Sequence, residues 1–152
     1  MSALSWEDLT KYDDNPPEDK ALPRSTSVQK RYGGYLGALK KKGITIGQDV
    51  MDRIIKNHHE QQIIVTKNDF PYNVAADIHH LVVWINPLIY ELSSADDAKR
   101  DQFARRYVKS LLPQSAEFVM FENLANNKSV ATVHHYQLFV RGECGMLPVE
   151  KL

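Results

Sequence analysis

The stretch from His79 to Ile85, which reads His-His-Leu-Val-Val-Trp-Ile, constrains the fold of this 152-residue chain more than any other feature. Its residue types favour a β-strand, and after the two histidines every position is apolar, so both faces of the strand carry apolar side chains. A strand that is apolar on both faces is usually central in its sheet and covered on both sides. The sequence therefore predicts a sheet with this segment at its centre.

Three further segments are predicted to be strands of the same sheet, namely 62–66, 117–121 and 130–141. The first holds the β-branched run Ile63-Ile64-Val65, and the last alternates apolar and polar residues over much of its length. The predicted fold class is α+β, with an antiparallel sheet of about four to five strands, helices packed on it, and a helical segment ahead of it.

Four helices are predicted from capping residues and from apolar residues that recur three and four positions apart. Short or medium helices begin after Ser5, Thr45 and Ser94, and a longer one covers 25–42. Three glycines interrupt the helix at 25–42, and each costs roughly 1 kcal/mol relative to alanine. We therefore expect close packing against these glycines, or a bend in the helix.

The length and composition are those of one domain. Hydrophobic residues make up 43% of the chain and charged residues 25%, which is enough to bury a core. Residues 1–24 are predicted to form an N-terminal helix and a polar strap, and 25–152 a single α+β domain. The strap is also the segment that we expect to meet a protein partner, if there is one.

Charge and cysteine content exclude several classes of function. Lys and Arg number 19, as do Asp and Glu, whereas nucleic-acid binders usually carry a basic surplus, so no nucleic-acid partner is expected. The single cysteine, Cys144, excludes an internal disulfide, and no segment approaches the roughly 20 apolar residues of a transmembrane helix. We expect a cytoplasmic protein, with the interior of an organelle such as the mitochondrion as the alternative.

Four of the six histidines form adjacent pairs on predicted strands, His79-His80 and His134-His135. Neighbouring strand residues point to opposite faces, so His135, Gln137 and Arg141 share one face and His80 or His79 can join them. Three interpretations stay open: core histidines bonded within the sheet, a ligand-binding cluster, and a metal site. Two histidines and an amide make a poor zinc site, so neither a metal nor another cofactor is predicted.

Two loops supply further candidate ligand-binding residues. Asn68, Asp69 and Tyr72 lie after a predicted strand, where they place polar groups at the mouth of the sheet or simply form a turn. Asn123 and Lys128 precede the last predicted strand and would offer an amide and a cation to a polar ligand, with a solvated loop as the alternative.

Three blocks of the chain resemble a fungal family named for N-acetylglucosamine-induced protein 1, a domain of unknown function. The blocks are Leu4–Leu9, Asn68-Asp69-Phe70-Pro71-Tyr72 with Ile78–Trp84, and Phe121 through Lys128-Ser129 to His135. The family carries a strand with H-x-H, which appears here as His135-Tyr136-Gln137. The resemblance brings no established reaction, and an activity that needs the second histidine is not expected.

The same segments are similar to the histidine-triad fold, whose last strand carries H-x-H-x-H and whose middle histidine attacks the α-phosphate of a nucleotide. The alternating positions here are His135, Gln137 and Phe139, and an amide cannot form the phosphoramidate intermediate. The resemblance implies a nucleotide or phosphosugar pocket without triad chemistry, in which His80, His135, Gln137 and Arg141 make polar contacts.

The leading functional prediction is a domain that binds a small polar or phosphorylated ligand, of nucleotide or amino-sugar type. The alternative is a non-catalytic accessory subunit docked in a larger protein assembly, which Gln137, the zero net charge and the polar strap favour. A third hypothesis is an enzyme that uses His80 or His135 as a general base, although the sequence offers it no nucleophile or metal. No catalytic residue is assigned.

Overall fold

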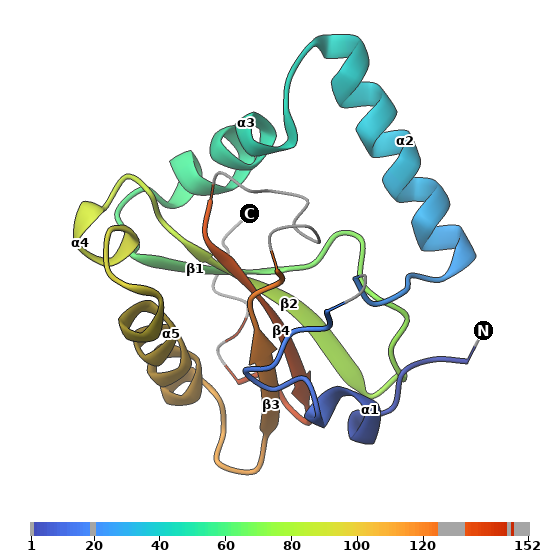
Figure 1. The fold of residues 1–152 in the computed structure, drawn as a ribbon, viewed down its shortest axis with the longest axis vertical. Coiled ribbons are helices and arrows are strands. Elements are labelled where there is room, and N and C mark those ends of the chain that lie inside the picture. Colours follow the sequence, from blue (N-terminus) through green and yellow to red (C-terminus); the bar gives the residue numbers. More distant parts are fainter. Residues whose placement is uncertain (1, 19–20, 125–132, 146, 148–152) are drawn as a thin grey trace.

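The computed structural model describes residues 2–18, 21–124, 133–145 and 147, which form an α+β fold (Figure 1). Its described strands form one antiparallel sheet in the order β1-β2-β4-β3. The strands are β1 (Ile63–Lys67), β2 (Ile78–Ile85), β3 (Glu117–Phe121) and β4 (His135–Arg141).

Strand β2 is central, as its apolar sequence predicts. It pairs with β1 along one edge and with β4 along the other, and every residue of the strand except His79 is buried. Strand β3 has the predicted bounds. Described strand β4 begins at His135, whereas the predicted strand begins at 130, and residues 130–132 of the predicted strand lie outside the described part of the chain.

Helix α5 (Asp97–Leu111) packs on one face of the sheet, which we call the α5 face. Alternate residues of the central strands point to it and are almost fully buried, because side chains on a strand alternate between faces. The cluster includes Leu81, Val83, Leu138 and Val140 of the sheet, with Ala104 and Val108 of the helix. This apolar layer is the larger core of the molecule.

The opposite face is covered at one end by α1 (Trp6–Thr10) and the strap that follows it. The predicted cap is confirmed, since the Ser5 side chain accepts from the Asp8 amide and the Asp8 carboxylate accepts from the Ser5 amide. Trp6 and Leu22 pack against Phe121 and Phe139. The N-terminal segment is therefore packed on the sheet.

The run of α3 (Ile46–Val50), η1 (Met51–Ile55) and η2 (Lys56–His58) covers the other end of this face, and α2 (Thr26–Lys42) stands to one side of the sheet (Figure 1). Val50 and Ile55 pack on Ile64, Val82 and Trp84 of the strands. Helix α2 itself is mostly exposed, and Leu39 is its one buried residue among those described.

The glycines of α2 do not meet the expected close neighbour. A Cβ added at Gly33, Gly34 or Gly37 would contact nothing within 4 Å in the described structure, so the prediction of close packing is wrong. Gly43 ends the helix with a φ of 70°, a left-handed conformation that favours glycine.

The start of α5 also differs from the prediction. Asp96, and not Ser94, caps the helix, with its carboxylate accepting from the Lys99 amide at 2.8 Å. Ser94 instead follows the short helix α4 (Tyr90–Ser93), and its hydroxyl donates to the Tyr90 carbonyl. Ser94 and Asp96 are both suited to cap the N-terminus of α5, and Asp96 is the cap because its backbone is extended, as at an N-cap position.

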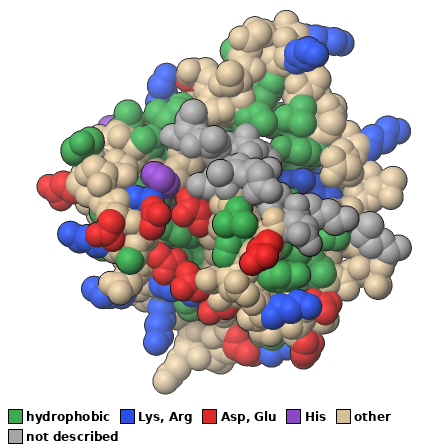
Figure 2. All heavy atoms as spheres, viewed as in Figure 1, with side chains coloured by type: hydrophobic (Ala, Val, Ile, Leu, Met, Phe, Trp, Pro, Cys, Tyr) green, Lys and Arg blue, Asp and Glu red, His purple; other side chains and the backbone are tan. Residues whose placement is uncertain are grey.

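Charge is distributed over the surface without one dominant sign. In the view of Figure 2, Lys and Arg side chains lie scattered around the rim, while acidic side chains gather over the lower half. Among the described helices, none is both long and apolar enough to cross a membrane.

Candidate ligand-binding site

A pocket of about 100 Å³ opens on the sheet face opposite α5, which we now call the pocket face. Strands β1, β2 and β4 form its floor, and α2, α3, η1 and the 68–72 segment form its walls. The floor residues are Thr66, Val82, Trp84, His135 and Gln137. The polar and aromatic wall residues are Arg24, Tyr32, Tyr35, Arg53, Asn68, Asp69, Phe70, Tyr72 and Asn123.

His80 lies next to the pocket floor, on the same face of the sheet, and its ring is fixed by two hydrogen bonds. Its Nδ1 accepts from the Tyr72 amide at 3.0 Å, so the ring proton is on Nε2, which lies 2.7 Å from the Gln137 Oε1 and donates to it. Burial lowers the pKa of His80 to about 3. The imidazole is therefore neutral at ordinary pH, and because both nitrogens are engaged it positions Gln137 and is unsuited to general-base chemistry.

Gln137 presents a hydrogen-bond donor to the pocket. Its Oε1 accepts from His80 and lies 3.5 Å from the Asn68 Nδ2. This fixes the amide orientation, so the Nε2 group is turned away from His80. Within the described residues, Gln137 makes no hydrogen bond through Nε2, and the residue lines the pocket. Two N–H donors are thus available on the floor.

Asn123 presents the complementary acceptor. The side chain is 5% exposed, and its Nδ2 donates to the Tyr72 hydroxyl at 3.1 Å. The Oδ1 atom is buried and has no hydrogen-bond partner in the described part of the molecule. Leaving a buried acceptor unsatisfied costs about 1–3 kcal/mol. A ligand that donates a hydrogen bond at this point would recover that free energy.

His135 lies apart from His80, although both reach the same face. In the β2–β4 register His80 is opposite Phe139, whereas His135 is opposite Trp84. The His135 ring packs on the Trp84 indole with centroids 5.0 Å apart, and its Nδ1 lies 2.9 Å from the Val133 carbonyl, to which it donates. The predicted histidine cluster is therefore two separate histidines on one face of the sheet, of which His135 lines the pocket and His80 bonds to Gln137 of its floor.

Arginine and aromatic side chains build the mouth. The Arg24 Nε donates to the Phe70 carbonyl at 2.8 Å, and the guanidinium lies over the rings of Tyr32, at 4.4 Å, and Tyr72, at 5.2 Å. Phe70 lies 5.1 Å from each of the Tyr32 and Tyr35 rings. Stacked cation and aromatic groups hold these side chains in place, because each packs on its neighbour.

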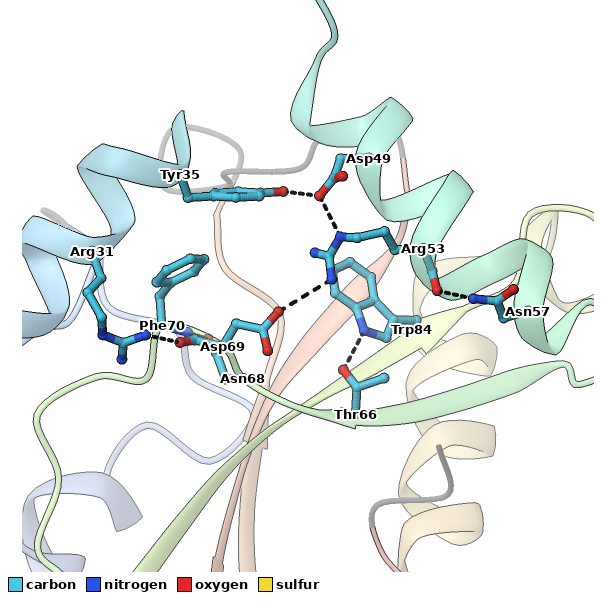
Figure 3. Close-up of polar contacts among 10 residues, drawn as sticks. All are labelled: Arg31, Tyr35, Asp49, Arg53, Asn57, Thr66, Asn68, Asp69, Phe70 and Trp84. Carbon is cyan, nitrogen blue, oxygen red and sulfur yellow. Dashed lines mark hydrogen bonds and ion pairs between the residues drawn. The ribbon is translucent and has the colours of Figure 1, made fainter. Parts of the chain in front are cut away.

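A polar chain crosses the pocket from α2 to the 68–72 segment (Figure 3). The Tyr35 hydroxyl donates to the buried Asp49 carboxylate, which also accepts from the Arg53 Nε at 2.8 Å. The Arg53 Nη1 then lies 3.7 Å from the Asp69 carboxylate. Burial and the bond to Asp49 raise the pKa of Tyr35 to about 12, so its phenol stays protonated as a donor.

The structure brings most of the predicted site residues to this pocket. Those that line it are Asn68, Asp69, Tyr72, Asn123, His135 and Gln137, and His80 bonds to Gln137 beside them. Arg141 is not among them. Its side chain pairs with Glu117 at 2.6 Å and lies 5.1 Å from the Trp6 ring, four residues or roughly 13 Å along β4 from Gln137. Lys128 lies outside the described residues.

Sequence reasoning missed the cationic and aromatic wall. Arg24 stands in the predicted strap and Arg53 on a predicted helix, and neither position carries a binding motif. The one signal was the i,i+4 spacing of Asp49 and Arg53, which predicts an ion pair but not its place over a pocket. Among the described residues, no group of three or more His, Cys, Asp or Glu side chains is arranged to hold a metal ion.

The fold and site define a small α+β domain with a polar pocket on one face of an antiparallel sheet. The chain belongs to the family described as "Protein of unknown function (DUF3605)", which matches residues 5–141. The resemblance to an uncharacterised family is thus confirmed at that level. The more specific resemblances, to the N-acetylglucosamine-induced protein 1 family and to the histidine-triad fold, stay predictions.

One solved structure has a similar fold. The crystal structure of HTC1 matches with a TM-score of 0.61 and 21% identity, over 92% of this chain and 86% of that one. At this identity the match shows the fold alone. Comparison with curated proteins gives no match.

Proposed function

We propose that this chain binds a small phosphorylated ligand, of nucleotide or amino-sugar type, in the pocket opposite α5. The observation that carries the proposal is the buried Asn123 Oδ1 acceptor, which has no hydrogen-bond partner among the described residues. It lines the same pocket as Gln137, whose Nε2 group offers a donor. Proteins rarely leave buried polar groups without partners, and such groups call for an explanation. A ligand with a donor and an acceptor on its uncharged part supplies one.

The rest of the lining fits the same class of ligand. Tyr32, Tyr72 and Trp84 offer flat surfaces for a sugar or base ring, and Arg24 and Arg53 offer guanidinium groups suited to a phosphate. Ligand pockets typically combine apolar walls with a few polar groups that fix orientation. This lining has that composition.

The proposal is one of binding without triad chemistry. Gln137 stands where the histidine-triad resemblance implies the nucleophile, and an amide forms no phosphoramidate. Its partner His80 is neutral and bonded at both nitrogens. We therefore expect no hydrolysis of the bound phosphate ester.

A thermal-shift panel tests the proposal. The probes are AMP, UMP and glucosamine 6-phosphate, each beside its unphosphorylated counterpart. A ligand at 100 times its Kd stabilises a protein by about 2.7 kcal/mol, and we expect at least one phosphorylated probe to raise the melting temperature. Gln137→Leu and Asn123→Leu should each lose that shift, whereas Arg141→Gln, outside the pocket, should keep it. No shift with any probe would contradict the proposal.

A second candidate function is that of a non-catalytic accessory subunit in a larger assembly, in the cytoplasm or in an organelle. Leu88, two residues before α4, and Tyr90, its first residue, are 56% and 79% exposed, and these apolar side chains favour a protein contact there. The strap supports this function less, since Leu22 packs on the chain's own sheet. A partner that copurifies in fixed ratio with the wild type but not with Leu88→Ser/Tyr90→Ser would support it, and unchanged copurification would exclude this surface.

A further inference from the structure

We infer that Arg53 binds the phosphate of the ligand at the mouth of the pocket, and that Asp69 is a built-in competitor for the same guanidinium. The inference rests on the proposed function, since it says how that pocket takes an anionic group. It assigns roles to Arg53 and Asp69, and Arg53 does not belong to a recognisable binding motif.

The guanidinium of Arg53 is held in place from one side. Its Nε donates to Asp49, which lies one helical turn earlier, is 8% exposed, and also accepts from the Tyr35 hydroxyl. Burial by itself lowers the pKa of Arg53, but the bonds to Asp49 and Tyr35 outweigh it and raise the pKa. A cation whose orientation is already fixed loses less conformational entropy when it binds an anion.

The other side of the guanidinium faces Asp69 across the mouth (Figure 3). The Arg53 Nη1 and the Asp69 Oδ2 are 3.7 Å apart, which is longer than a hydrogen bond, and the two side chains are 47% and 59% exposed. Exposed ion pairs of this kind contribute little, whereas a phosphate can accept two parallel N–H bonds from arginine. A phosphate therefore outcompetes the Asp69 carboxylate for Arg53.

The Asp69 side chain can give way without any movement of the backbone. The turn is fixed on both sides of it, because the Asn68 Oδ1 accepts from the Phe70 amide at 2.8 Å and the Asp69 carbonyl accepts from Arg31 at 3.4 Å. The carboxylate makes no hydrogen bond within the described residues and pairs with Arg53 alone. Rotation of one side chain therefore exchanges a carboxylate for a ligand phosphate.

Inorganic pyrophosphate, titrated by calorimetry at low ionic strength, tests this inference without a known organic ligand. Asp69→Asn should bind pyrophosphate about two- to fivefold more tightly than the wild type, the range that an exposed ion pair implies. Asp77→Asn is the matched control, since it removes the same charge at an exposed position outside the pocket lining. Arg53→Gln should bind about tenfold more weakly or worse. In the Arg53→Gln background, Asp69→Asn should have no further effect.

Several results would overturn the inference: no binding of pyrophosphate by Asp69→Asn, equal affinities for Asp69→Asn and Asp77→Asn, or a gain that persists without Arg53. Asp69 is exposed, so its variant is expected to fold. The proposed function is judged separately by the thermal-shift panel. A nucleotide that binds through Gln137 regardless of Arg53 and Asp69 would leave that proposal standing and remove this one.

Discussion

The two faces of the sheet are built from the same strands, yet their buried side chains differ in kind. On the α5 face, Leu81, Val83, Leu138 and Val140 are all at most 2% exposed and apolar. On the pocket face, the intervening positions of the same strands include His80, His135 and Gln137, which are 5–7% exposed. Burial alone does not distinguish the two faces; hydrogen bonding does.

The comparison shows what a buried polar group requires. The His80 Nε2 and the Gln137 Oε1 are partners in one hydrogen bond, which orders the floor of the pocket. Of the two polar atoms of the Asn123 side chain, only the Nδ2 has a partner among the described residues. Among the described residues, the α5 side also holds buried polar atoms without a hydrogen-bond partner, the Arg100 Nε and the Tyr136 hydroxyl, and burial raises the pKa of that hydroxyl. That hydroxyl belongs to the apolar core, while Asn123 lines the pocket.

The largest effect is expected on the α5 face. Leu138→Ala should lower the free energy of unfolding by about 2–5 kcal/mol, because it removes a fully buried side chain from a packed core. Urea denaturation measures this. The folded variant should bind any panel ligand with unchanged affinity, and a large loss of affinity would show that the two faces are not independent.

Acid should destabilise the pocket face through His80. The pKa of His80 is lowered to about 3 in the folded chain, against 6.5 for a free histidine. Between these values the unfolded chain binds a proton that the folded chain does not, so stability falls as the pH falls. The contribution from pH 6 to pH 4 is about 2–3 kcal/mol. His80→Asn, which keeps an acceptor for the Tyr72 amide, should lose that part of the pH dependence.

The neighbouring residue provides the control for the acid experiment. His79 is exposed on the same strand, and His79→Asn should keep the pH dependence of the wild type in denaturation curves recorded from pH 4 to pH 7. If the free energy of unfolding changes with pH equally in the wild type and in His80→Asn, the assignment of His80 as a neutral, structural histidine is contradicted.

Gln137→Leu should lower the free energy of unfolding by about 1–3 kcal/mol, because it leaves the His80 Nε2–H buried without its acceptor. Gln137→Glu keeps an acceptor at this position but removes the pocket donor. Circular dichroism and a thermal melt of this variant show whether an acceptor for His80 is sufficient to keep the floor of the pocket folded. A Leu variant as stable as the wild type would mean that the bond to His80 contributes nothing.

The smallest change in stability is expected from the double variant Asn123→Leu/Tyr72→Phe. It removes both partners of one hydrogen bond together with the unsatisfied Oδ1, so stability should stay within about 1 kcal/mol of the wild type. Ligand binding should nevertheless be lost. A stable variant that binds normally would remove Asn123 from the site.

Much of the fold follows from local patterns in the sequence. The apolar run of β2 predicts its central place, and strand alternation predicts that His135 and Gln137 share a face. The predicted start of α5 is wrong because Ser94 and Asp96 are both residue types that cap helices. Local chemistry ranks such residues too closely to choose between them.

The site was harder to predict, because it depends on contacts between distant segments. Arg24, Arg53 and Asp69 line one pocket because the segment before α2, the η1 turn and the 68–72 segment come together at one end of the sheet. Sharing a face also does not mean sharing a site, since Arg141 points to the same face as Gln137 but pairs with Glu117 at the far end of β4. Periodicity gives the face of a residue and not its position in the pocket.

The most direct test of the account is a titration followed by nitrogen–proton NMR of the side-chain amides. We expect a phosphorylated ligand from the panel to shift the Gln137 and Asn123 resonances in a saturable manner. The amide of Asn86, which is buried but bonded to the His59 and Gln61 carbonyls, should not move. If the Gln137 and Asn123 amides stay unchanged with every probe at millimolar concentration, the pocket face is a polar core and not a binding site.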